Sequence, residues 1–257
     1  MTDPLAPLLE LDGVAEAVKA AQDAVFAVHR HPANLRGGSA TAAEASVRAA
    51  RASAAIEGAD PEIPADAAVK DPVLAGALRV AEALESLLPT WRRAPAQALA
   101  RMHVLAAADL VANADSPGGP EAEVAAARDA EVLGRPRPGT GARLNLLAQL
   151  VTGATSVPGP LLAAVVHGEL LALRPFGTAD GVVARAAARL TMVATGTDPK
   201  SLTVPEVACF RRVVQYNDAA AAFATGEPDG VRTWLLFCCD AMEKGAREAR
   251  GIADAAT

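Results

Sequence analysis

Residues 158–195 constrain the fold of this chain more than any other segment, because they place two apolar stretches on either side of a short loop. Over residues 161–173 the polar side chains are those of His167 and Glu169 alone, a pattern that is typical of a helix buried on all sides. Pro175 cannot continue such a helix, because it lacks a backbone donor and its ring collides with the preceding turn. The sequence therefore predicts a core helix that ends just before Pro175.

The loop over residues 174–181 is expected to lead directly into a second helix over residues 181–194. Asp180 stands at the position of an N-cap, where a short carboxylate accepts hydrogen bonds from the first free N–H groups of a helix. A glycine-containing loop before a helix N-terminus directs several backbone N–H groups to one point. The loop therefore has the features of an anion site.

The composition favours helices over sheets. The chain of 257 residues is 51% hydrophobic but only 3% aromatic, and much of its apolar content is alanine. Alanine favours helices and lets neighbouring helices approach closely, whereas the residues that favour strands are scarce. We therefore expect an all-α fold, a helical bundle with a central helix–loop–helix. Further helices are expected over residues 12–30, 41–56, 73–88, 96–113, 144–152, 204–223 and 229–249.

Charge and cysteine usage exclude several function classes. A net charge of −6 argues against a general binder of nucleic acids or anionic membranes. No apolar run is long enough to cross a membrane, and the acidic start is unlike a signal peptide, so we expect a cytoplasmic protein. Cys209, Cys238 and Cys239 lack the spacing of metal ligands. We expect reduced thiols packed in the core and no metal site.

The segment RPFGTADGVVAR, residues 174–185, resembles the signature HPFx(D/E)GNGRxxR of the Fic (Fido) family. The positions that fit the signature are Pro175, Phe176, Gly181 and Arg185, and those that differ are Arg174, Thr178, Ala179, Asp180 and Val182. The resemblance extends over about residues 96–247, where helices are expected in the family's order. The family is all-helical and typically transfers AMP from ATP to a protein hydroxyl. The resemblance therefore implies a Fic-like fold.

A second match lies upstream of this core. Residues 53–58, SAAIEG, fit the motif (S/T)xxxE(G/N), which marks an inhibitory helix in many Fic proteins and here comprises Ser53, Glu57 and Gly58. In that arrangement the resemblance implies an ion pair between Glu57 and Arg185 that ties the N-terminal helix to the core. The alternative is two unrelated surface charges. The expected organisation is an N-terminal helical extension over residues 1–72, a Fic-like core over residues 73–250 and a tail over residues 251–257.

Four positions lack the chemistry that the family's reaction requires. The resemblance places Arg174 where the family has its basic histidine, and a guanidinium cannot accept a proton. Losing a general base typically costs ~10²–10⁴-fold in rate. Thr178 replaces the acidic metal ligand, Asp180 replaces a neutral Asn with a charge that repels phosphate, and Val182 replaces the first arginine. The expected remnant of the anion or nucleotide site comprises Phe176, Gly177, Thr178, Asp180, Gly181 and Arg185.

The remaining candidate residues have two interpretations each. Arg174 is either a helix-end arginine that satisfies C-terminal carbonyl groups or a contact to phosphate or to a partner. His103 and His167 are expected to be core histidines hydrogen-bonded to the backbone rather than catalytic groups. His29 and His31 flank the end of a helix and are expected to face solvent.

These patterns predict a degenerate Fic-domain protein that has lost AMP transfer and acts as a pseudoenzyme, a regulator or a protein-interaction module. The alternative is an active nucleotide-dependent transferase in which Arg174 and Arg185 clamp the anion. A third interpretation is a structural helical bundle without a ligand. We expect no cofactor under the first interpretation, and ATP with Mg²⁺ only under the alternative. The expected partner is another protein, not a nucleic acid or a membrane, and a homo-oligomer is also compatible with the sequence.

Overall fold

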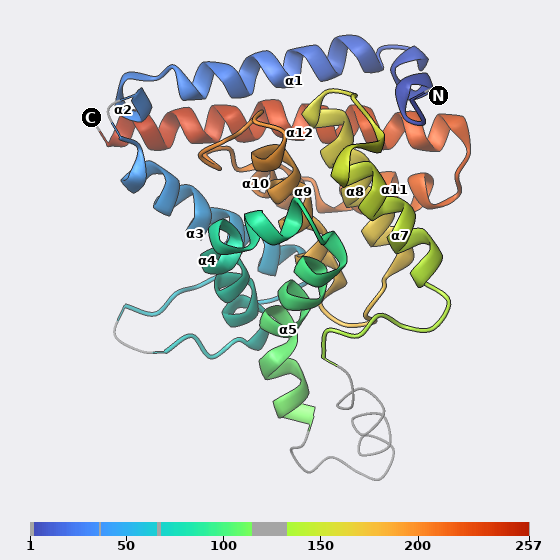
Figure 1. Cartoon of the computed structure of the whole chain (residues 1–257). Coiled ribbons are helices and arrows are strands. Elements are labelled where there is room, and N and C mark those ends of the chain that lie inside the picture. The colour runs from blue at the N-terminus through green and yellow to red at the C-terminus, as the bar shows by residue number, and fades with distance from the viewer. Residues whose placement is uncertain (1–2, 36, 66–67, 115–132, 257) are drawn as a thin grey trace.

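A computed structural model describes residues 3–35, 37–65, 68–114 and 133–256 (Figure 1). Within these residues every regular element is a helix, which confirms the predicted all-α fold. In chain order the elements are η1 (Ala6–Glu10), α1 (Val14–His29), α2 (Pro32–Leu35), α3 (Ser39–Ile56), α4 (Pro72–Trp91), α5 (Pro95–Ala114), α7 (Gly141–Gln149), η2 (Leu150–Ala154), α8 (Gly159–Leu173), α9 (Asp180–Ala194), α10 (Pro205–Arg211), α11 (Val213–Ala224) and α12 (Pro228–Ala255).

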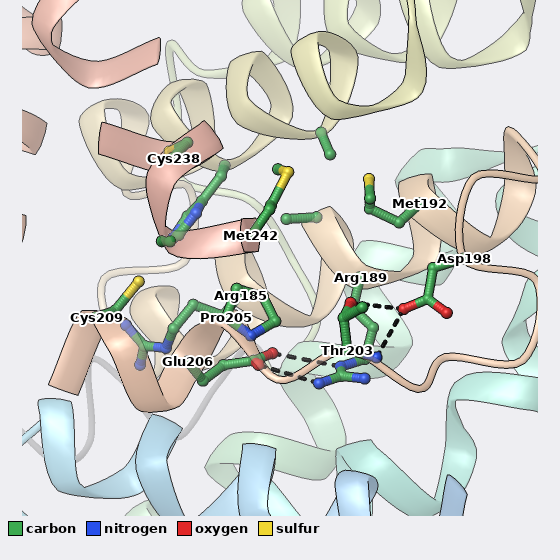
Figure 2. Close-up of a pocket in the computed structure, with 14 residues that line it drawn as sticks. Arg185, Arg189, Met192, Asp198, Thr203, Pro205, Glu206, Cys209, Cys238 and Met242 are labelled. Carbon is green, nitrogen blue, oxygen red and sulfur yellow. Dashed lines mark hydrogen bonds and ion pairs between the residues drawn. The ribbon is translucent and has the colours of Figure 1, made fainter. Parts of the chain in front are cut away.

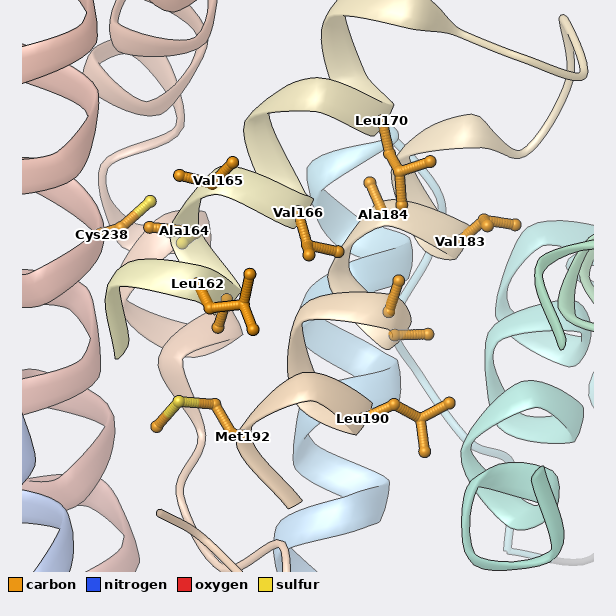
Figure 3. Close-up of a cluster of buried hydrophobic side chains, with 14 of the residues drawn as sticks. Leu162, Ala164, Val165, Val166, Leu170, Val183, Ala184, Leu190, Met192 and Cys238 are labelled. Atoms are coloured by element: carbon orange, nitrogen blue, oxygen red, sulfur yellow. The ribbon is translucent and has the colours of Figure 1, made fainter. Parts of the chain in front are cut away.

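Helices α8 and α9 form the centre of the bundle and pack against each other. Helices α4 and α5 cover α9, whereas α11 and α12 cover α8, and α1 lies along α12 at one edge of the molecule (Figure 1). Figure 3 shows Val166 and Leu170 of α8 beside Ala184 of α9. The central helix–loop–helix predicted from the sequence is therefore confirmed.

Helix α8 is apolar on all sides because it is enclosed by other elements. Gly168 lies in this helix at a point where a Cβ atom would come within 2.7 Å of Trp234 Nε1 and 2.8 Å of the Phe223 ring. The indole N–H of Trp234 donates to the carbonyl of Ala164 at 2.8 Å, so this buried donor has a partner. Only glycine lets the two aromatic side chains approach α8 this closely.

The predicted helix over residues 204–223 is divided into α10 and α11. Arg212 separates them with a non-helical backbone, φ −130° and ψ 43°. Its guanidinium lies 4.7 Å from the centre of the Phe237 ring and pairs with Asp240 at 2.6 Å. Both partners are on α12, so contacts that are remote in sequence accompany the break.

Helix α12 continues to Ala255, so the described part of the expected tail, residues 251–256, is mostly helical. The division into an N-terminal extension, a core and a tail stays a prediction. Among the residues that the structure describes, none of the helices combines the length and the apolar character that crossing a membrane requires.

Replacing Gly168 by Ala should lower the free energy of unfolding by about 1–3 kcal/mol, because the added methyl group forces Trp234 or Phe223 to move. Gly251→Ala in α12 is the matched control, since a Cβ atom there meets nothing within 4 Å. It should leave stability unchanged or raise it by up to about 1 kcal/mol. Urea unfolding of both variants measures the difference, and equal effects would contradict the packing described for α8.

Candidate functional site

The predicted anion loop lies at the mouth of a cleft of about 400 Å³. The cleft is bounded by the end of α3, the end of α8, the start of α9 and one face of α11. Its polar and charged lining residues include Glu57, Arg174, Asp180, Arg185, Tyr216 and Asn217. The structure therefore brings together residues that are as far as 160 positions apart in sequence.

The loop turns sharply because three of its residues have left-handed backbones. Arg174 (φ 45°), Gly177 (φ 85°) and Ala179 (φ 52°) lie in the left-handed region, which residues other than glycine adopt at some energetic cost. Arg137 holds the start of the loop: its backbone N–H donates to the Pro175 carbonyl at 2.7 Å, and its guanidinium donates to the Arg174 carbonyl at 2.7 Å. A backbone donor and a side-chain donor from a separate segment therefore hold two carbonyl groups of the loop in place.

The Arg174 side chain is exposed at the rim of the cleft. Arg174 caps the C-terminus of α8, and its own N–H donates to the Leu170 carbonyl. Among the described residues its guanidinium donates no hydrogen bond, and Arg137 satisfies the carbonyl at this helix end. The interpretation of Arg174 as the side chain that satisfies these carbonyl groups is therefore wrong, and its guanidinium lies at the exposed rim close enough to Asp180 to act on that carboxylate.

Asp180 binds the loop rather than capping the helix. Its two carboxylate oxygens accept the N–H groups of Phe176 at 2.9 Å and of Gly177 at 2.8 Å. Helix α9 begins at Asp180 itself and Ala179 is the N-cap residue, so the predicted N-cap role is wrong. Because the left-handed turn at Ala179 places the carboxylate under the loop, two of the N–H groups expected to bind an anion are already occupied.

The Asp180 carboxylate is buried, and this burial raises its pKa above the usual value. The two loop N–H groups and the guanidinium groups of Arg174 and Arg137 act in the opposite direction. The two loop N–H groups and the two nearby guanidinium groups thus partly compensate the cost of burying the Asp180 carboxylate.

Thr178 and Phe176 are both in contact with His103 on α5. The His103 ring stacks on the Phe176 ring with 4.3 Å between their centres, and its Nε2 lies 3.0 Å from the Thr178 hydroxyl. His103 Nδ1 accepts the N–H of Gly134 at 2.9 Å, so Nε2 carries the proton and donates to Thr178. Burial lowers the His103 pKa to about 4. The prediction of a core histidine with a backbone hydrogen bond is confirmed.

The side chain of Arg185 is buried beneath the cleft, with 3% of it exposed. Its guanidinium donates to Glu57 Oε1 at 2.7 Å, to the Ser53 hydroxyl at 2.8 Å, to the Ser53 carbonyl at 3.0 Å and to the Tyr216 hydroxyl at 3.2 Å. The predicted ion pair with Glu57 is confirmed. All three of its nitrogens have partners, as a buried cation requires.

Two glycines allow the end of α3 to reach Arg185. Gly58 has a left-handed backbone, φ 84°, and terminates α3 directly after Glu57. A Cβ atom at Gly181 would collide with the Glu57 carboxylate, so the glycine at the start of α9 leaves space for this carboxylate. Ser53, Glu57 and Gly58 thus each have a structural task in the contact between α3 and α9.

Tyr216 on α11 was not among the predicted site residues. Its hydroxyl accepts from Arg185 and lies 2.8 Å from His167 Nε2, so it links the arginine to the core helix α8. His167 is therefore bonded to a side chain, which corrects the expected backbone bond. Burial, together with the nearby charge of Arg185, lowers the His167 pKa to about 3. The one available signal for Tyr216 was that it is the chain's single tyrosine.

A second buried ion pair lies behind the site. Figure 2 shows Arg189 of α9 beside Glu206 of α10 in the lining of a small pocket of about 40 Å³. The Arg189 guanidinium lies 3.0 Å from the Glu206 carboxylate. Cys209 and Cys238 line this pocket as free, buried thiols, and burial raises the Cys209 pKa to about 12. The predicted core role of these thiols is confirmed, and the described residues contain no cluster of three or more His, Cys, Asp or Glu that could hold a metal.

The two N-terminal histidines have partners rather than solvent. His29 Nε2 lies 2.8 Å from the buried Asp198 carboxylate, and His31 Nε2 lies 3.0 Å from Asp254. Each histidine side chain is only 16% exposed. The expectation that both face solvent is therefore wrong, because α12 and the loop after α9 cover them.

No family model matches the sequence, and no curated protein matches it either. A match is found among solved structures: the crystal structure of a Fic family protein from Desulfovibrio desulfuricans G20 covers 93% of this chain and 74% of that chain, with a TM-score of 0.67. The chain has the Fic fold. The sequence identity of 16% shows the fold alone, so the activity of this Fic-fold chain must be argued from its own residues.

Glu57→Gln should lower the free energy of unfolding by about 1–3 kcal/mol, because a buried guanidinium then lacks its carboxylate. The effect stays below that of a fully buried pair, since the Glu57 side chain is 34% exposed. The matched control is Glu169→Gln, whose partner Arg143 is more exposed and which should cost less than about 1 kcal/mol. Urea denaturation compares the two, and a smaller effect at Glu57 than at Glu169 would contradict the assigned role of the pair.

Lowering the pH from 7 to 5 should destabilise the protein through His103. In the unfolded chain His103 binds a proton below about pH 6.5, whereas in the folded chain it does so only near pH 4. Stability therefore falls as the pH decreases through this window. The expected loss from His103 is about 2 kcal/mol. His103→Gln should reduce the difference in unfolding free energy between pH 7 and pH 5 by about this amount. An unchanged pH dependence would show that His103 is not buried in its neutral form.

Proposed function

We propose that this chain is a Fic-fold protein that has lost AMP transfer to protein hydroxyls and that acts as a regulatory or protein-interaction module. The observation that carries the proposal is the position of Asp180. Its carboxylate accepts the loop N–H groups of Phe176 and Gly177, which in the anion-site interpretation would bind a phosphate. A nucleotide phosphate would have to displace this carboxylate and would meet its negative charge.

The residues at the other positions also do not fit ATP and Mg²⁺. The exposed Arg174 is a permanent cation and offers no proton acceptor. The Thr178 hydroxyl is bound by His103, and a neutral hydroxyl is a poor sole anchor for Mg²⁺. Val182 is buried and apolar, so it offers no contact to phosphate. These positions together support the loss of the family's reaction.

The contacts of Arg185, another lining residue of the cleft, support the same proposal. This arginine is the one cationic residue retained from the signature, and Glu57, Ser53 and Tyr216 satisfy its guanidinium. Freeing it for a nucleotide would separate the buried guanidinium from the Glu57 carboxylate, which we expect to cost about 1–3 kcal/mol because Glu57 is partly exposed. In this proposal the pair is structural and holds helix α3 on the core as part of a stable scaffold.

Calorimetric titration of the full chain with ATP and MgCl₂ tests the proposal, together with incubation of the chain in a cell lysate with ATP labelled in its α-phosphate. We expect no saturable binding heat and no labelled protein beyond the background without the chain. Arg174→Ala should behave like the wild type in both assays, as should the control variant Arg101→Ala on the exposed face of α5.

Saturable ATP binding that Arg174→Ala weakens and Arg101→Ala does not, accompanied by transfer of label to protein, would contradict the proposal. That outcome would favour an active transferase in which Arg174 and Arg185 clamp the anion.

A further inference from the structure

We propose that a groove on this chain, separate from the cleft at the anion loop, binds an acidic peptide segment of a partner protein. Helices α3, α10 and α12 surround this groove, which has a volume of about 630 Å³. We call it the basic groove after its charged lining, which comprises Arg48, Arg211, Arg212, Lys244, Arg247 and Glu248. This proposal does not depend on whether the anion loop binds a nucleotide.

The basic groove concentrates positive charge on a protein that is acidic as a whole. Five of its lining residues are cationic, although the chain has a net charge of −6. Among the described residues, three carboxylates form ion pairs with these cations, namely Glu44, Glu248 and Asp240. Two positive charges therefore remain in excess. This local charge opposes the charge of the whole molecule, so an acidic ligand is attracted specifically to this surface.

The cations of the groove differ in how firmly they are held. Asp240 binds both Arg212 at 2.6 Å and Lys244 at 2.5 Å, and Arg212 also lies over the Phe237 ring. Arg211 and Arg247 are exposed, and Arg247 forms no ion pair with any described residue. The groove thus combines a fixed positive wall with two accessible guanidinium groups that can bind carboxylates in bidentate geometry.

The uncharged lining of the groove leaves room for a peptide backbone. Val207, Ala208 and Gly251 are small or medium-sized, and nothing lies within 4 Å of the position that a Cβ atom at Gly251 would take. Val207 is partly exposed and offers apolar contact between the charged side chains. A peptide with carboxylates on one side and small side chains on the other matches this lining.

A nucleic acid fits these features less well than an acidic peptide. Nucleic-acid binders usually carry a basic stripe on a basic domain, whereas here the cations are confined to one groove of an acidic chain. Glu44, Asp240 and Glu248 also lie among the cations and would repel a continuous phosphate backbone. Separate carboxylates on a peptide can instead meet the exposed guanidinium groups individually.

Fluorescence anisotropy tests the proposal with the full chain and a fluorescein-labelled peptide of alternating Asp and Glu. We expect saturable binding that weakens as salt is raised. The double variant Arg211→Glu/Arg247→Glu should weaken binding by about tenfold or more. The control Arg93→Glu/Arg101→Glu changes net charge equally at exposed positions outside the groove, and it should change the affinity by less than about twofold. Circular dichroism confirms folding, and Arg211→Gln/Arg247→Gln replaces the first variant if that variant unfolds.

Three results would overturn the proposal. The first is that the peptide shows no saturable binding at low salt. The second is that the groove variant and the control lose equal affinity, which would mean that net charge alone attracts the peptide. The third is that an oligothymidylate of matched charge binds more tightly and displaces the peptide, which would assign the groove to nucleic acid instead.

Discussion

The buried guanidinium of Arg185 is the interaction on which the arrangement of this site depends. A cation with so little exposure is stable only when its charge is paired and each of its donors has an acceptor. Ser53 and Glu57 of α3 and Tyr216 of α11 supply these acceptors from segments far away in sequence. Arg185 therefore fixes two flanking helices on the central pair, and Tyr216 extends the network to His167 in α8. One hydrogen-bond network therefore joins α3, α9, α11 and the core helix α8.

The protein's own carboxylates lie at both positions of the cleft where the Fic resemblance places anion-binding groups. Asp180 accepts two backbone N–H groups of the loop, and Glu57 binds Arg185 from the end of α3. Each satisfies donors that would otherwise be unpaired in a partly enclosed cleft, so each stabilises the folded chain, and in the function that we propose each also excludes an external anion. The same contacts that hold this Fic fold together thus account for the loss of chemistry that we propose. The basic groove is lined by α3, α10 and α12, where cations remain in excess.

Part of the fold and of the site could be predicted from the sequence, because the signals were local or came from the resemblance to the Fic motifs. The apolar run before Pro175 predicted α8, and the resemblance of residues 53–58 and 174–185 to two Fic motifs implied the ion pair between Glu57 and Arg185. Asp180 was misassigned because a short carboxylate before a helix ordinarily caps that helix. Its actual direction depends on the left-handed backbones of Gly177 and Ala179, which no residue pattern shows for an alanine. The contact of His103 with Thr178 joins residues 75 positions apart, so packing rather than any local pattern determines it.

The most direct test of the account is a crystal structure of the full chain grown with ATP and MgCl₂. The account predicts that Glu57 stays within hydrogen-bonding distance of Arg185, that the Asp180 carboxylate still accepts the N–H groups of Phe176 and Gly177, and that the loop holds no phosphate. Density for a triphosphate bound by the loop, with Asp180 turned away and Arg185 directed at the nucleotide, would contradict it.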